Sequence, residues 1–195
     1  MEFPTRPHGG PAVSLVKLLV SFAPWIAFLI IARDSMARVE IGLVAALALS
    51  VVMAVLKLHR GVIMWVGLVF FTAATVAVLG FHSVWAVRHL GVLANGALAL
   101  GSWITLAIGK PFTLEYARAH TDPSKWNNPQ FIRVNVLLTS VWATVFTVNA
   151  VLAWTMMKHL LTELAGHTAS YVTLIGAAVF TSWYPKRVRA KRSAV

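Results

Sequence analysis

The fold is decided by the stretch VIMWVGLVFFTAATVAVL, residues 62–79, which contains no charged side chain. A helix needs about 20 mainly apolar residues to cross a bilayer core about 30 Å thick. The strand of a transmembrane barrel would be about ten residues long and would alternate polar with apolar positions. This stretch is continuously apolar, so it predicts a membrane-spanning α-helix.

Similar apolar runs lie on both sides of this stretch. They predict an all-α, polytopic membrane protein, in which the whole chain forms one domain built as a bundle of six transmembrane helices. The predicted spans are 13–32, 41–56, 62–79, 84–108, 131–156 and 168–183, with a loop at 109–130 and a basic tail at 184–195.

Composition supports this class of protein. The chain has 195 residues, of which 58% are hydrophobic and 12% charged, whereas soluble domains are roughly 45–50% apolar and about 25% charged. A soluble globular domain is therefore excluded. The chain has no cysteine, which excludes disulfides, thiolate metal sites and a cysteine nucleophile.

Residues that typically begin or end helices support the predicted boundaries. Ser83 can cap the span that follows it, and Asn128 with Pro129 fits an N-cap followed by proline at the first helical position. An aspartate–proline pair at 122–123 predicts a short turn of helix inside the long loop. Pro185 predicts the end of the last span.

The distribution of lysine and arginine predicts the orientation. With six spans, 13 of the 17 basic residues lie on the side of the two termini. Because cytoplasmic loops carry the excess of such residues, both termini are expected in the cytoplasm. Basic clusters beside a membrane hold anionic lipid headgroups, so we expect lipid partners rather than nucleic acid. The remaining four basic residues are Arg33, Arg38, Arg88 and Lys158.

Residue types that carry catalysis are scarce. No aspartate or glutamate lies in the middle of a predicted span, which disfavours a proton pump or a carboxylate-driven antiporter. The chain has no GxSxG motif, no phosphate-binding glycine loop with a lysine, and no paired carboxylates. We therefore expect a protein that is not an enzyme, with no cofactor and no catalytic or metal-binding residue.

Uncharged polar side chains gather on the fourth and fifth spans. On the fifth span they share one stripe of a helix with Phe146, because Asn135, Thr139, Trp142, Phe146 and Asn149 recur at steps of four, three, four and three residues. Small residues on the fourth span allow close helix approach. The set is either a tight helix interface or the lining of a polar cavity, and the second reading would make the protein a small transporter or channel with a neutral pathway between the last three spans. Its members are Asn95, Ser102, Trp103, Asn135, Thr139, Trp142 and Asn149.

Four histidines fall on the predicted outer side. His82 and His89 are seven residues apart near the start of the fourth span, and His159 and His167 flank the loop after the fifth. Imidazoles can ligate haem or a metal. A membrane haem or redox protein is therefore a second alternative.

The loop at 109–130 mixes aromatic side chains with charges of both signs. Such a stretch can lie on lipid headgroups, with its aromatic rings as anchors and its cations meeting phosphate. It can also be a docking site for a partner protein. Its candidate residues are Lys110, Phe112, Glu115, Tyr116, Arg118 and Trp126.

This loop and the span after it carry a family resemblance. The run GKPFTL at 109–114, a tryptophan and Pro-x-Phe ahead of the next span, Asn135, VWA at 141–143 and Asn149 resemble the bacterial intracellular septation protein A group. The likeness covers about residues 109–155. It implies a small protein of the bacterial inner (plasma) membrane with a non-enzymatic role in septation or cell-envelope integrity. That role would be exerted through contacts with other membrane proteins, and a homo-oligomer remains open.

Overall fold

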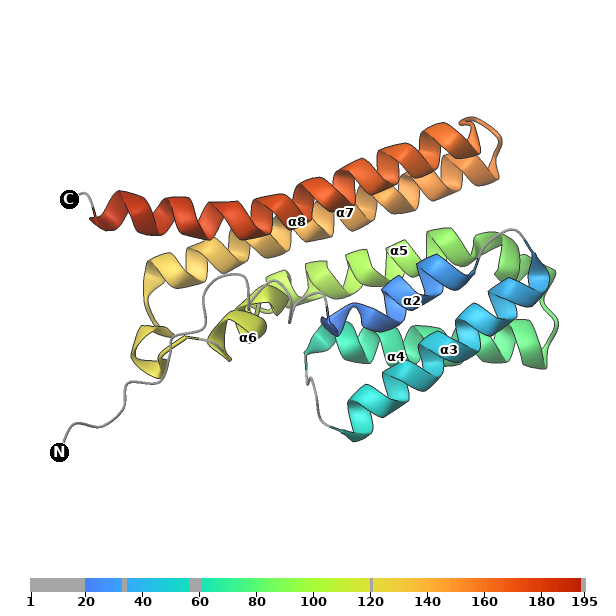
Figure 1. Ribbon diagram of the computed structural model, residues 1–195, viewed down its shortest axis with the longest axis horizontal. Coiled ribbons are helices and arrows are strands. Elements are labelled where there is room, and N and C mark those ends of the chain that lie inside the picture. The colour runs from blue at the N-terminus through green and yellow to red at the C-terminus, as the bar shows by residue number, and fades with distance from the viewer. Residues whose placement is uncertain (1–19, 33–34, 57–60, 120, 194–195) are drawn as a thin grey trace.

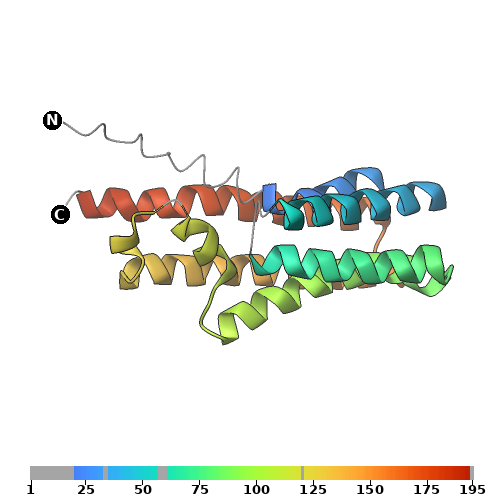
Figure 2. The same cartoon turned by 90° about the horizontal axis from the view of Figure 1, so that it is seen from below.

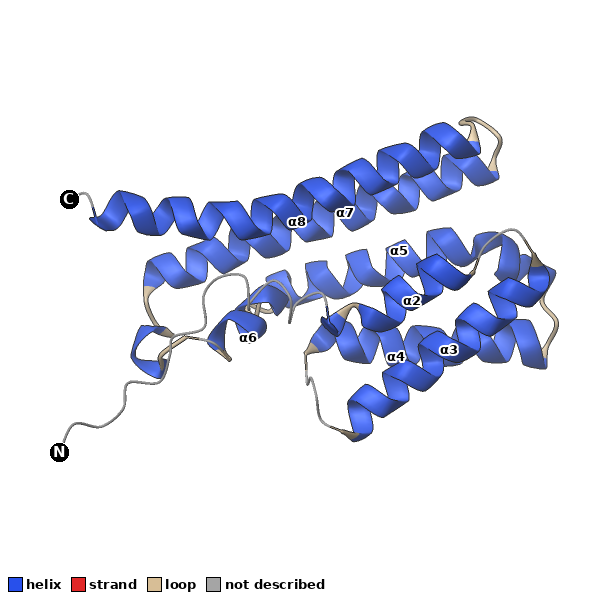
Figure 3. Ribbon diagram, viewed as in Figure 1, coloured by secondary structure: helices blue, strands red, loops and turns tan. Residues whose placement is uncertain are grey.

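The computed structural model describes residues 20–32, 35–56, 61–119 and 121–193. Throughout these residues the chain is helical with short turns, and none of them lies in a strand (Figure 3). Five helices of this part are long and apolar enough to cross a membrane. They are Met36–Val55 (α3), Val62–Thr75 (α4) continued by a π-helical turn Val76–Gly80 (η1), Val84–Ala107 (α5), Pro129–Met157 (α7), and the Glu163–Val188 part of α8, which spans Glu163–Ser193.

Three shorter helices complete the described chain. The predicted first span, 13–32, begins outside the described residues, and within them it contains the nine-residue helix α2, Ala23–Ile31. The long loop holds α6, Phe112–Arg118, and the 3-10 turn η2, Pro123–Lys125. Helical membrane spans are thus found as predicted, while a sixth span and the sides of the termini remain predictions.

Helix starts follow the capping residues seen in the sequence. The Ser83 hydroxyl accepts a hydrogen bond from the Ala86 amide at 3.2 Å, and the Asn128 side chain accepts one from the Gln130 amide at 2.9 Å. The Asp122 carboxylate likewise begins the predicted turn of helix in the long loop. Each side chain satisfies one backbone N–H that lacks a partner at a helix start.

Two helix ends differ from the prediction. Helix α3 begins at Met36 rather than residue 41, because Ser35 accepts a hydrogen bond from the Arg38 amide at 3.3 Å and caps a first turn that hydropathy alone leaves out. Pro185 does not end the last span, since α8 continues through it to Ser193. A proline removes one backbone hydrogen bond, and a membrane helix tolerates that loss. Residues 184–193 of the basic tail are therefore the last part of a helix.

The helices pack as neighbours in chain order, with α5 against α7 as the most extensive pair. Figure 2 shows two layers, with α2, α3 and α8 in one layer and α4, α5 and α7 in the other. Helix α5 approaches α4 closely at Gly101, where an added Cβ would lie 2.7 Å from a Val66 methyl carbon. A glycine at this point allows the close backbone approach that membrane helices use to pack.

Aromatic rings fill the centre of the bundle. Phe22 stacks on Trp142 of α7 with ring centroids 5.7 Å apart, and Trp25 of α2 meets Phe71 of α4 at 4.8 Å. All four rings are buried. This core ties α2 to α4 and α7 in the opposite layer.

The alternating helix directions sort the turns between two ends of the molecule. The turns at 81–83 and 158–162 lie at one end, and α6, η2 and the last turns of α8 lie at the other (Figure 1). Most of the described lysines and arginines belong to the second end, which we call the basic end. They include Lys110, Arg118, Lys125, Arg133, Lys186 and Arg187.

Candidate functional site

Helix α6 turns back into the bundle at the basic end. The turn before it needs Gly109, whose φ of +70° lies in the region that favours glycine. The Thr113 hydroxyl bonds the Asn135 carbonyl at 2.9 Å and lies 2.9 Å from the Thr139 hydroxyl. The Thr113 amide also donates to the Thr139 hydroxyl at 3.3 Å. Thus Asn135 and Thr139 are brought together by a threonine that the sequence reading did not select.

Two aromatic residues of this loop are not surface anchors. Phe112 is 1% exposed and Tyr116 is 8% exposed, and the Phe112 ring packs edge-on against Phe22 at 6.5 Å. The expectation that both rings meet headgroups or a partner is therefore wrong. Apolar rings near a membrane surface can be covered by lipid or by the protein's own helices, and sequence composition does not separate the two.

The Tyr116 hydroxyl lies in a tight site between helices. Burial raises the pKa of its phenol from the ordinary 10.0 to about 12. That pKa already includes two smaller effects, a lowering by the hydrogen bond with Ser21 and a raising by the Glu115 carboxylate. A Cβ added to Gly61 would lie 2.5 Å from this hydroxyl oxygen. Tyr116 is therefore a packed, neutral residue that fixes α6 against the start of α4.

The other loop candidates remain at the surface. Lys110 and Glu115 are exposed, and Arg118 and Trp126 are half-buried. The Arg118 guanidinium lies 5.7 Å from the centre of the Trp126 ring, within the range of a cation–π contact. The Trp126 indole also donates to the Thr121 carbonyl at 2.9 Å. These four residues are the part of the loop that can meet headgroups or a partner.

The remaining polar residues of α7 face α8. The Trp142 indole donates to the Thr181 hydroxyl at 3.0 Å, and the Asn149 carbonyl oxygen accepts from the Thr173 hydroxyl at 3.2 Å. Asn149 is almost fully buried, and its amide nitrogen has no hydrogen-bond partner among the described residues. The stripe predicted on the fifth span thus lies inside the protein and connects two helices.

The polar residues of α5 bond within their own helix or to α7. Ser102 donates to the Leu98 carbonyl at 2.7 Å, and Asn95 donates to the Gly91 carbonyl at 2.9 Å. The indole of Trp103, a side chain that is 45% exposed, donates to the Thr147 hydroxyl of α7 at 3.1 Å. This pattern is typical of polar residues satisfied at a helix interface.

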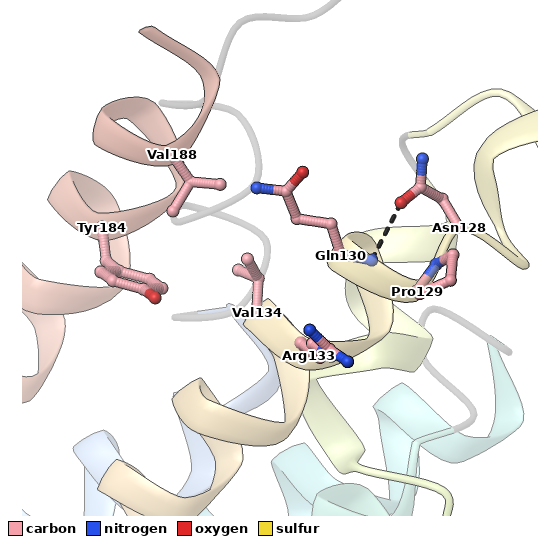
Figure 4. A pocket seen from close by; sticks show the side chains of 7 residues that line it. All are labelled: Asn128, Pro129, Gln130, Arg133, Val134, Tyr184 and Val188. Carbon is pink, nitrogen blue, oxygen red and sulfur yellow. Dashed lines mark hydrogen bonds between the residues drawn. The ribbon is translucent and has the colours of Figure 1, made fainter. Parts of the chain in front are cut away.

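A pocket of about 490 Å³ lies at the basic end, between the start of α7 and the end of α8. Figure 4 shows Tyr184 and Val188 of α8 on one side, and Gln130, Arg133 and Val134 of α7 on the other. The sequence reading missed it because the pocket needs α8 to continue beyond Pro185. The only feature of the sequence that points to this pocket is the Asn128 cap with Pro129 at the start of α7, because both residues line the pocket. The lining residues are Asn128, Pro129, Gln130, Arg133, Val134, Tyr184 and Val188.

The four histidines that were predicted on the outer side serve local structure. His82 and His159 hold left-handed turn conformations with φ of 47° and 56°. The His89 Nδ1 lies 2.8 Å from the Trp85 carbonyl, and the His167 ring stacks on Tyr171 at 6.4 Å. Within the described residues, no group of three or more histidines and carboxylates is placed to hold a metal ion.

The apolar helices, the buried core and the uncharged helix interfaces define a helical integral membrane protein. Comparison of the chain with protein-family models, with curated proteins and with solved structures finds no match, so it is assigned to no family. Function must therefore be inferred from the molecule itself.

Proposed function

We propose that this protein acts without catalysis, through contacts with other proteins inside the membrane. The role that its loop resemblance implies, in septation or cell-envelope integrity of a bacterium, is the setting that we propose for those contacts. The observation that carries the proposal is the open face of α8.

Helix α8 is the least covered span. In the most apolar stretch of α8, 11% of the residues are buried, whereas 28–39% are buried in the corresponding stretches of the other four spans. The main neighbour of α8 is α7. The outward face of α8 is a continuous strip of exposed side chains, with a glycine in its middle. The strip consists of Val172, Ile175, Gly176, Val179 and Trp183.

Gly176 gives this strip a shape that suits another helix. A Cβ placed on Gly176 would find no atom within 4 Å, so its backbone is open to a partner. Small residues at a helix surface allow a second helix to come close enough for van der Waals contact. Lipid tails cover an apolar face equally well but gain nothing from a glycine. The strip therefore favours a helix of another membrane protein.

Complementation tests the role. Cells of the source organism that lack the protein should form long or misshapen cells, and the unaltered chain should restore them. Gly176→Leu should fail to restore them, because the larger side chain blocks close helix approach. Gly96→Leu is the matched control, since Gly96 of α5 also has no neighbour within 4 Å of a placed Cβ. Normal division without the protein would refute the septation role.

Cross-linking tests the face itself. Since the chain has no cysteine, Ile175→Cys can carry a benzophenone probe at one known position. It should form a defined adduct with an envelope or division protein that is lost in Gly176→Leu. Val69→Cys on α4 is the control, because Val69 is 67% exposed and Ile175 is 63% exposed. Equal adducts at both positions would contradict a specific face.

A further inference from the structure

We propose that the pocket between α7 and α8 at the basic end binds the phosphate of an anionic phospholipid headgroup. The pocket is separate from the open strip of α8 and from α6. The inference does not depend on the partner contacts proposed above, and it rests on where the pocket lies, what lines it and what surrounds it.

The position of the pocket matches the depth of a headgroup. Its α7 residues lie in the first two turns of a membrane span, which begins at Pro129. Its α8 residues, Tyr184 and Val188, lie at the end of another span, Glu163–Val188. Both helices therefore reach the membrane boundary where the pocket opens. Its volume of about 490 Å³ is within the range of small-molecule sites.

The lining is polar on some walls and apolar on others. Arg133 can donate two parallel hydrogen bonds to a phosphate, and the Gln130 amide and the Tyr184 hydroxyl add donors. Val134 and Val188 supply an apolar wall that suits the first carbons of a glycerol backbone. This combination fits the junction between a charged headgroup and its chains better than it fits a fully hydrated ion.

Charge around the pocket has one sign. No acidic side chain lines it, and Arg133 has no ion pair among the described residues. Lys186 and Arg187 are exposed on the adjacent turns of α8, and the Arg187 guanidinium rests 4.9 Å from the Trp183 ring centre. Basic pockets between membrane helices on the cytoplasmic side are known to hold anionic headgroups. The chemistry recognised is a phosphate, and the apolar walls indicate that a lipid supplies it.

Native mass spectrometry of the purified protein in detergent tests the proposal. Phosphatidylglycerol and phosphatidylcholine with the same acyl chains are added in parallel. We expect phosphatidylglycerol to bind more tightly. Arg133→Gln should weaken its binding about fivefold, the equivalent of about 1 kcal/mol for one cationic contact. Arg88→Gln is the matched control, because Arg88 is an exposed arginine at the opposite end, and it should bind like the unaltered chain.

A second variant separates the pocket from general charge. Val134→Trp keeps every charge but fills the cavity, so it should also weaken phosphatidylglycerol binding, while circular dichroism confirms its helix content. If it does not fold, Val188→Trp fills the same space from α8. Full binding by a folded, filled variant would overturn the proposal, as would equal losses in Arg133→Gln and Arg88→Gln.

Soluble phosphates form the last arm of the experiment. Inorganic phosphate and glycerol 3-phosphate, each in large excess over the lipid, should leave the bound phosphatidylglycerol in place. If either compound displaces phosphatidylglycerol from the unaltered chain but not from Arg133→Gln, a free phosphate is the ligand. That result would overturn the assignment to lipid.

Discussion

The Thr113 hydroxyl donates to the Asn135 carbonyl, 22 residues further along the chain, and its amide donates to the Thr139 hydroxyl, 26 residues further along. Thr113 is 4% exposed, so water cannot replace its hydrogen bonds. Leaving a buried polar group without its partner costs more free energy than the hydrogen bond itself contributes to stability. The position of α6 thus depends strongly on one small side chain.

We expect Thr113→Val to lower the free energy of unfolding by about 1–3 kcal/mol. The substitution keeps the size of the side chain but leaves the Asn135 carbonyl and the Thr139 hydroxyl without this partner. Unfolding of the purified protein by denaturant measures the change. Thr168→Val is the control, because Thr168 is exposed on α8 and should change stability by less than about 0.5 kcal/mol. Equal losses would contradict the role given to Thr113.

Tyr116 makes stability depend on pH in the alkaline range. An unfolded chain loses this phenolic proton near pH 10, whereas the folded chain keeps it until about pH 12. Between these values the unfolded state binds fewer protons, so stability must fall as pH rises, by at most about 1.4 kcal/mol per pH unit. Tyr116→Phe should show a shallower fall between pH 10 and 12. Identical slopes for the two proteins would show that Tyr116 ionises normally.

The role of a side chain could be predicted from the sequence only where its partners are close to it in the chain. Caps at Ser83 and Asn128 depend on hydrogen bonds to residues two or three positions away, and the sequence predicts them directly. Phe112 and Tyr116 are buried by contacts with α2 and the start of α4, which are distant in the chain. Their aromatic character could not distinguish a lipid neighbour from a protein neighbour.

At the scale of helices, glycines determine how closely two helices approach each other. A Cβ on Gly42 of α3 would lie 2.9 Å from the Ala32 Cβ after α2. Gly96 of α5 has open space in the same test. The same substitution should therefore have opposite effects at the two positions.

We expect Gly42→Ala to destabilise the protein by about 1–3 kcal/mol, because α2 must move away from α3. Gly96→Ala should stabilise it by up to about 1 kcal/mol, since alanine favours a helix over glycine. Denaturant unfolding of the two variants, purified in the same detergent, compares them. If Gly96→Ala lowers the free energy of unfolding as much as Gly42→Ala does, glycine itself is required at these positions, rather than close packing.

The last helix shows why element ends are harder to predict than elements. Hydropathy identified its apolar centre, but Pro185 suggested a stop. The structure instead continues the helix to Ser193, because one missing hydrogen bond does not outweigh the others on both sides. The pocket beside Arg133 exists only through this continuation, which is why the sequence did not reveal it.

For the whole molecule, the length of the continuous apolar runs predicted the class of fold and most spans. The central stretch at 62–79 forms the α4 helix and its π-helical turn, Val62–Gly80. What hydropathy cannot supply is the pairing of spans. The extensive contact of α5 with α7 depends on small side chains and on the turn at Gly109, which are properties of three-dimensional packing.

The alternating helices sort the turns between two ends, and the sides that we predict for these ends from lysine and arginine can be measured directly. We expect Ser124→Cys and Ala190→Cys to react with an impermeant maleimide only from the cytoplasm, because both lie at the basic end. Leu160→Cys, at a residue 70% exposed at the other end, should react only from outside. Phe81→Cys, at a residue 78% exposed, is the second outer position. Labelling of Ser124→Cys and Leu160→Cys from one side would refute this arrangement.

The inward return of α6 also sets a requirement on biosynthesis. The ribosome delivers α6 before α7, yet the Asn135 and Thr139 groups that receive Thr113 belong to α7. During synthesis Thr113 therefore lacks these two hydrogen-bond partners until α7 has been made, although Phe22 and Gly61, which pack against the rings of α6, are already present. The hydrogen bonds that hold α6 thus form only after the helix that follows it.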